Sequence, residues 1–335
     1  MIPFSVLDLS TIVEGGTAGD ALANSRDLAR HAEKLGYKRF WMAEHHGMTG
    51  IASAATAVAL AHVGDGTSTI RIGAGGVMLP NHAPLVIAEQ FGTLSALFPG
   101  RVDLGLGRAP GSDQRVAQAM RRTLTSDVNQ FPRDVVELQS YFAGEADGGV
   151  IAVPGAGEDV PLYILGSSLF GAQLAAALGL PFAFASHFAP GDLDEAIALY
   201  RRLFQPSPQC PAPYVMLGFN IFAAPTDAEA ELLASSMQQA IVALRTGQPR
   251  KMQPPVAGYR DTLPPQAIAM LDHMLQGSAI GSPETVKRKV SAFLTRTNAD
   301  ELIVGCQMFD HDARKRSFSI AAEVRDSLAS EALAA

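Results

Sequence analysis

Short apolar runs with the length and residue types of β-strands alternate with segments of helical periodicity along the whole chain, and this alternation constrains the fold more than any other feature. Eight runs are expected to be strands: 4–9, 39–44, 70–79, 101–107, 161–166, 181–186, 215–224 and 301–306. Helices are expected at 22–35, 52–63, 85–97, 113–122, 134–142, 170–178 and 192–204, and from Thr226 and Asp312 onward. Strand–helix–strand order implies parallel strands, because each crossover needs a dozen or more residues. Eight such units predict an α/β fold of the (β/α)8 TIM-barrel type, with a doubly wound sheet as the alternative.

We expect residues 1–335 to form a single domain, because no linker divides the chain into comparable halves. A barrel of this length can be one domain. The segment 246–266 is rich in proline, glycine and charged residues. A long irregular segment inside a compact domain is usually a lid or another excursion. We therefore expect a mobile lid at 246–280 after the seventh strand, carrying a short helix at 268–276.

Composition excludes several classes of protein. The chain is 47% apolar and 18% charged, which is typical of a globular enzyme. Its net charge of −7 and the lack of a dense Lys/Arg run disfavour a nucleic-acid partner. Two cysteines, Cys210 and Cys306, cannot build a disulfide framework or a four-cysteine zinc site. No apolar run reaches the ~18 residues of a membrane span, and the first residues lack a signal-peptide pattern, so we expect a cytoplasmic enzyme without a membrane partner.

In a TIM barrel the active site lies at the carboxyl ends of the strands. Glu44, His45 and His46 follow the second predicted strand. A histidine there can serve as general base or hydrogen-bond donor, because its pKa is ordinarily near ~6.5; the alternative is that one of the pair packs inward as a structural residue. Together with His82 or His187 these three residues are candidates for a zinc or iron site, because imidazole and carboxylate suit both metals. Adjacent strand residues point to opposite sides and HExxH is absent, so we expect no metal site.

Gly75 and Gly76 lie together near the end of the third predicted strand. Glycine inside a strand often marks the close approach of a ligand or of another backbone. A flat aromatic cofactor over this backbone would use the space left by the missing Cβ atoms. A β-bulge is the equally supported alternative.

Residues after the fourth and fifth strands point to an anion. Arg108 can place its guanidinium on a phosphate, although a solvated arginine is the common alternative. Gly166, Ser167 and Ser168 lead directly into a helix, whose free N–H groups and positive dipole end favour an anion. A serine there can also be a plain helix cap. Together these residues suggest a phosphorylated cofactor, although the nearby glycines do not match the dinucleotide fingerprint.

Five more polar residues fall at expected strand ends and are candidates to line a substrate cavity, although such residues are more often structural hydrogen-bonders. They are Asp8, Asn81, His187, Asn220 and Gln307.

Three segments, 43–63, 67–113 and 165–188, resemble the bacterial-luciferase-like family of flavin-dependent monooxygenases. The similarity is strongest to the single-gene luciferase-family oxidoreductases of bacteria, and it covers nearly the whole chain. It implies a (β/α)8 barrel with an excursion after strand seven, and reduced FMN at the C-terminal face. In the family a separate NAD(P)H-dependent flavin reductase usually supplies the reduced FMN. O2 adds to flavin C4a, and the peroxyflavin oxidises the substrate, a long-chain aldehyde in the luciferases.

The resemblance assigns roles to individual residues. His45 matches the catalytic histidine of the family's Glu-His-His motif, with Glu44 beside it near the flavin. Gly75–Gly76 matches the site of a non-prolyl cis peptide against which the isoalloxazine packs. These matches predict that His45 is catalytic and that the others bind the flavin.

The phosphate site carries over as well, with two departures. Arg108 and Ser167 match an arginine and a serine that bind the flavin phosphate. Gly107 stands where the light-emitting enzymes have a reactive cysteine, and Gly166 where they have a glutamate. The resemblance therefore supports the flavin site and not light emission.

Two other functions are consistent with the same residues. One is hydride transfer with a deazaflavin, which relatives in this superfamily use. The other is a flavin-binding protein without activity. Alanines spaced through 52–61 make a smooth helix, and family members commonly dimerise through the second and third helices, so we expect a homodimer.

Overall fold

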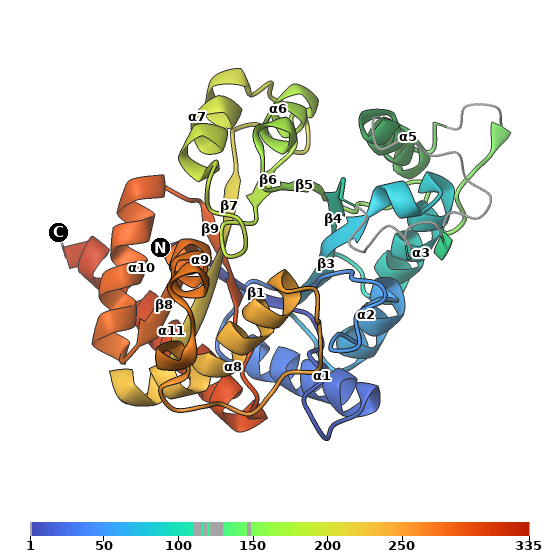
Figure 1. The fold of residues 1–335 in the computed structure, drawn as a ribbon. Coiled ribbons are helices and arrows are strands. Elements are labelled where there is room, and N and C mark those ends of the chain that lie inside the picture. The colour runs from blue at the N-terminus through green and yellow to red at the C-terminus, as the bar shows by residue number, and fades with distance from the viewer. Residues whose placement is uncertain (1, 110–115, 117–118, 121–129, 146–148, 335) are drawn as a thin grey trace.

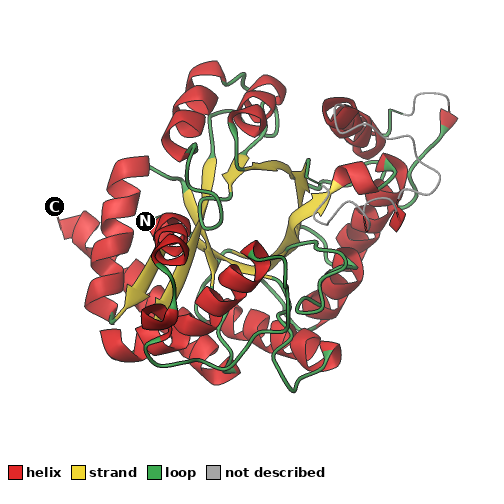
Figure 2. Cartoon of the chain, in the orientation of Figure 1, coloured by secondary structure: helices red, strands yellow, loops and turns green. Residues whose placement is uncertain are grey.

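Eight parallel strands close into a barrel in the computed structural model, which describes residues 2–334 except 110–115, 117–118, 121–129 and 146–148. Helices surround the ring of strands (Figure 2). The predicted TIM barrel is confirmed, and each of the eight predicted strands is present. In order around the barrel the strands are β1 (Phe4–Asp8), β2 (Arg39–Met42), β3 (Arg71–Met78), β4 (Val102–Gly107), β5 (Leu162–Gly166), β6 (Phe182–Phe184), β7 (Val215–Ala223) and β9 (Glu301–Gly305).

The helices follow the strands in sequence (Figure 1). They are α1 (Ala18–Lys34), α2 (Thr56–Asp65), α3 (Pro84–Leu97), α5 (Phe131–Ala143), α6 (Leu169–Leu178), α7 (Leu193–Leu203), α8 (Asp227–Arg245), α9 (Pro265–Met274), α10 (Pro283–Thr297) and α11 (His311–Ala334). The helix expected at 113–122 falls largely outside the described residues. Among the described helices, none is long and apolar enough to cross a membrane.

A ninth strand, β8 (Ser278–Gly281), and helix α10 were not predicted from the sequence. The short β6 pairs only with the first residues of β7, at Val215–Leu217, so the same edge of β7 is open further along. There β8 pairs in parallel with Asn220–Ala223. Its four residues, Ser-Ala-Ile-Gly, do not alternate between apolar and polar side chains and so give no strand signal. Helix α10 does carry a start signal, because Ser282 caps it and Pro283 occupies its first position.

The segment expected to be a lid contains α9 and ends in β8. Its first part is attached to the loop after β1: Met252 N donates to Ile12 O at 3.0 Å, and Glu14 N donates to Met252 O at 2.8 Å. Gln239 on α8 also donates to the carbonyl of Pro254 at 2.8 Å. These bonds hold 252–254 across the carboxyl ends of the strands. Mobility of the lid remains a prediction.

The barrel interior is layered. At the amino-terminal end, Arg39 bridges the buried carboxylates of Asp103 and Glu301, at 2.8 Å each. Above this charged layer Trp41 and Tyr163 pack edge to face, with ring centroids 4.9 Å apart. These aromatic rings belong to an apolar cluster that closes the barrel from below. The space above the cluster, at the carboxyl ends of the strands, is open.

Candidate functional site

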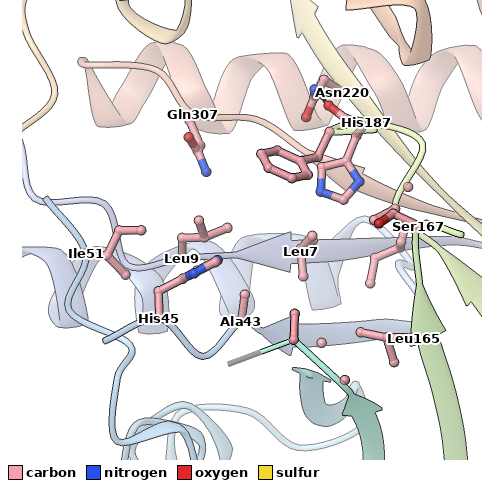
Figure 3. A pocket seen from close by; sticks show the side chains of 18 of the residues that line it. Leu7, Leu9, Ala43, His45, Ile51, Leu165, Ser167, His187, Asn220 and Gln307 are labelled. Atoms are coloured by element: carbon pink, nitrogen blue, oxygen red, sulfur yellow. Dashed lines mark hydrogen bonds between the residues drawn. The ribbon is translucent and has the colours of Figure 1, made fainter. Parts of the chain in front are cut away.

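A cavity of about 470 Å³ opens at the carboxyl ends of the strands. Nine of the residues singled out from the sequence line it: His45, Gly75, Arg108, Gly166, Ser167, Ser168, His187, Asn220 and Gln307. The remaining lining is predominantly apolar and comes from strand ends, from α8 and from 249–252. Figure 3 shows His45 and Ala43 on one side of this space and His187 and Gln307 on the other. The barrel thus brings most of the predicted site together.

His45 and Glu44 lie on different sides of the same chain segment. His45 lines the cavity, whereas the Glu44 side chain is 2% exposed and is bound behind the wall. Its Oε1 is 2.7 Å from Nε2 of His46 and 2.8 Å from Nε2 of His82. Burial raises the pKa of Glu44, but the hydrogen bonds and charges of His82 and His46 outweigh burial and hold it below its usual range. Glu44 is therefore a carboxylate that anchors two imidazoles.

Glu44, His46 and His82 bring one ligand atom each within 4.8 Å of the others, and they are the set of described residues best placed to hold a metal ion. His45 and His187 do not join them, because both line the cavity. The alternation of side chains along an extended segment accounts for this separation. The expectation of no metal remains a prediction.

The peptide bond between Gly75 and Gly76 is cis, as the resemblance implied. Gly75 lines the cavity, whereas Gly76 lies behind it and its carbonyl accepts a bond from Glu44 N at 3.3 Å. A Cβ on Gly76 would lie 2.6 Å from the carbonyl oxygen of Gly105. The two glycines therefore give the cavity a smooth backbone wall. A larger residue in the pair would displace that backbone.

Arg108 and the start of α6 form a positive corner of the cavity. The Arg108 guanidinium stacks on the Phe170 ring, 4.1 Å from its centroid. Ser168 occupies the N-cap position of α6, yet within the described structure its side chain makes no capping bond, and the first turn holds no acidic residue. The hydroxyls, the N–H groups of the first turn and the guanidinium are the donor set that a phosphate needs. Phe170 was missed from the sequence because an aromatic residue early in a helix predicts only packing.

Asp8 and Asn81, predicted to line the cavity, do not. Leu7 faces the barrel interior, so Asp8 points outward, where its Oδ1 pairs with Arg314 at 2.7 Å. The same arginine donates to the carbonyl of Cys306 at 2.6 Å. Asn81 is buried in a short 3₁₀ helix, Leu79–Asn81. The correction is that Asp8 supports the β9 wall from behind.

His187 supplies a pH-dependent contribution to stability. Burial, with a smaller effect of the His45 charge, lowers the pKa of His187 to about 4. The unfolded chain therefore binds one more proton between pH ~6.5 and about 4, and stability falls as the pH falls through that window. Acidification from pH 7 to 5 should cost the wild type about 2 kcal/mol more than His187→Leu, measured by urea unfolding at both pH values. Equal losses in the two proteins would contradict this assignment.

A family model described as luciferase-like monooxygenase matches residues 2–301. The chain belongs to this family. A luciferase-like monooxygenase of Escherichia coli K12 is 52% identical over 328 residues, 98% of each chain. The N-acetyl-S-alkylcysteine monooxygenase of Bacillus subtilis 168 is 37% identical over 307 residues, 88% of this chain and 89% of the relative.

Solved structures agree with this membership. Apo-MsnO8 superposes with a TM-score of 0.87 at 32% identity and covers 97% of this chain and 99% of its own. The FMN complex of the oxygenating constituent of 3,6-diketocamphane monooxygenase from Pseudomonas putida has a TM-score of 0.73 at 16% identity, covering 96% and 97%. The F420-dependent tetrahydromethanopterin reductase of Methanopyrus kandleri has a TM-score of 0.67, also at 16%, covering 96% and 97%. The two distant likenesses establish the shared barrel only.

Proposed function

We propose that this chain is an FMN-dependent monooxygenase that takes reduced FMN from a separate NAD(P)H-dependent flavin reductase and uses O2 to oxidise a small organic substrate. One observation carries the proposal. A single cavity joins the phosphate donors at Arg108 and α6, the smooth Gly75–Gly76 backbone and the imidazole of His45. A phosphorylated, planar cofactor is the ligand class that fits all three features.

The residues would act in distinct ways. Arg108, Ser167 and Ser168 would bind the phosphate, and Gly75 would support one face of the ring. Reduced FMN, when bound, supplies the electrons that activate O2. His45 would hold or transfer a proton beside the ring. The apolar lining would exclude water, which otherwise diverts activated oxygen to hydrogen peroxide.

FMN binding tests this proposal directly. Arg108→Ala is expected to raise the dissociation constant of FMN about 10- to 100-fold, because a charge-assisted pair with the phosphate is lost. The measurement is flavin fluorescence during titration with protein, with exposed Arg202 on α7, replaced by alanine, as the control. Equal affinity of Arg108→Ala and the wild type would remove the phosphate role. Failure of the wild type to bind reduced or oxidised FMN would overturn the whole proposal.

The same titration distinguishes the deazaflavin alternative. A deazaflavin such as F420 differs from FMN in its ring and side chain, and the reductase of Methanopyrus kandleri shares the barrel. We expect FMN to bind at least tenfold more tightly than F420. The reverse order would assign the chain to hydride transfer. The N-acetyl-S-alkylcysteines that name the Bacillus subtilis relative are the first compounds to assay as oxygen acceptors.

We also propose a homodimer that forms through α2 and α3. Both helices leave apolar side chains uncovered: Val58 is 72% exposed, Leu97 60% and Val86 43%. Large exposed apolar side chains grouped on adjoining helices are typical of an interface. We expect sedimentation velocity to give a dimer at micromolar concentration, and Val58→Asp with Leu97→Asp to give a monomer. Leu232→Asp on α8 is the matched control, and a monomeric wild type would contradict the proposal.

A further inference from the structure

The loop after β6 presents His187 to the cavity, and its neighbours fix the position of the ring. Asn220 Nδ2 donates to the main-chain carbonyl of His187 at 3.0 Å. Ser186 Oγ donates to the carbonyl of Gly218 at 2.6 Å, which ties the loop to β7. Gly218 lies directly behind the imidazole, since a Cβ there would be 1.9 Å from Nδ1 of His187. The glycine thus leaves the space that the ring occupies.

The His187 ring has hydrogen-bonding capacity that the protein does not use. Nδ1 is buried and, among the described residues, has no hydrogen-bond partner. Burial and the charge of His45 lower the pKa of His187 to about 4, so the ring is neutral at physiological pH. A neutral imidazole offers one donor nitrogen and one acceptor nitrogen. Because Nδ1 is buried against Gly218, the nitrogen left for a ligand in the cavity is Nε2, which forms no hydrogen bond with a described residue.

Gln307 lies on the same wall and points into the same space (Figure 3). In the part of the chain that the structure describes, its amide forms no hydrogen bond. Most of the remaining lining is apolar. It includes Leu7, Leu9, Ile51, Met237, Ile241 and Met274. No described residue that lines the cavity is acidic, and its two arginines are Arg108 and Arg250. His187 and Gln307 are neutral polar groups in a lining that is mostly apolar.

We propose that His187 and Gln307 bind a polar oxygen of the substrate in a mostly apolar cavity. This inference rests on the proposed function. With FMN bound against Gly75 and Ala43, the part of the cavity in front of His187 and Gln307 would remain for the substrate. A carbonyl-type oxygen has two lone pairs and accepts from both the imidazole N–H and the amide N–H. A cationic group finds no counter-charge in the described lining, which holds no acidic residue. Both side chains are substrate-binding residues that position the reacting molecule.

A matched pair of probes tests the inference. In 2-heptanone the carbonyl oxygen is present, and in 2-methylhept-1-ene a methylene group replaces it at nearly the same shape. Isothermal titration of protein loaded with oxidised FMN should give about tenfold tighter binding of the ketone. His187→Leu and Gln307→Leu should each reduce this preference several-fold, and His187→Gln should restore part of it.

Two glycine variants distinguish the effect of displacing the His187 ring from a general loss of structure. Gly218→Ala keeps the histidine but displaces its ring, and it should reduce the ketone preference as His187→Leu does. Gly191→Ala lies in the same connection between β6 and α7, where a Cβ meets no described atom within 4 Å, and it should leave the preference unchanged. The FMN dissociation constant, measured on the same samples, should stay within about twofold of wild type. Absence of ketone binding, equal binding of the two probes, or an unchanged preference in His187→Leu would overturn the inference. Loss of FMN binding by the wild type would overturn the proposed function instead.

Discussion

His45→Ala is expected to lower oxygen transfer to a substrate by about 10²- to 10⁴-fold, the range that a positioned acid–base group contributes. FMN affinity should change by less than about twofold, because the phosphate donors Arg108 and Ser167 follow β4 and β5, whereas His45 follows β2. The reaction should still consume reduced FMN, but the electrons should appear as hydrogen peroxide. The measurement is product formed and peroxide released per reduced FMN oxidised, with any substrate that the wild type oxidises.

The control for this variant is a histidine away from the cavity. His273→Ala, on the exposed face of α9, should have the ratio of product to peroxide of the wild type. An unchanged ratio in His45→Ala would show that His45 has no part in the chemistry. A large loss of FMN affinity in His45→Ala would instead make His45 a flavin-binding residue.

The barrel was predictable from sequence because its signals are local. Each strand and helix carries its own periodicity, and the β/α alternation then restricts the arrangement. The departures occur where pairing depends on distant residues. The edge of β7 that receives β8 is open only because β6 is three residues long, and no local pattern in 278–281 records this.

The sequence predicted at which strand end each site residue lies. It did not predict whether the side chain points into the cavity or away from it. Position after a strand placed His187, Asn220 and Gln307 correctly at the cavity. The same criterion failed for Asp8, because it does not specify which way a side chain points along a strand. Leu7 and Leu9 both line the cavity, so Asp8 between them must face outward to Arg314. The alternation of side chains along the strand, judged from the apolar neighbours, would have shown that Asp8 faces away from the cavity.

The largest effect on stability is expected at the amino-terminal end of the barrel, away from the cavity. The Arg39 side chain is 4% exposed and pairs with Asp103 and Glu301, whose side chains are fully buried. Arg71 also pairs with Asp103, and Ser5 and Tyr214 donate to Glu301. Arg39 on β2 therefore joins two other strands, β4 and β9, through buried ion pairs.

Arg39→Met is expected to lower the free energy of unfolding by about 3–5 kcal/mol, because Glu301 then lies buried beside Ser5 and Tyr214 without its buried cation. The measurement is urea unfolding followed by circular dichroism, since Trp41 lies in the same cluster and its fluorescence would change for local reasons. Arg26→Met is the control: Arg26 pairs with Asp65 at 2.8 Å, but that carboxylate is 76% exposed, and the expected cost is about 0–1 kcal/mol. The double variant Arg39→Met with Glu301→Gln should recover part of the loss, because it removes a buried carboxylate whose remaining cation is Lys38, at 3.4 Å and 39% exposed. If Arg39→Met costs no more than Arg26→Met, water must reach the carboxylates through the end of the barrel, and the charged layer does not close it.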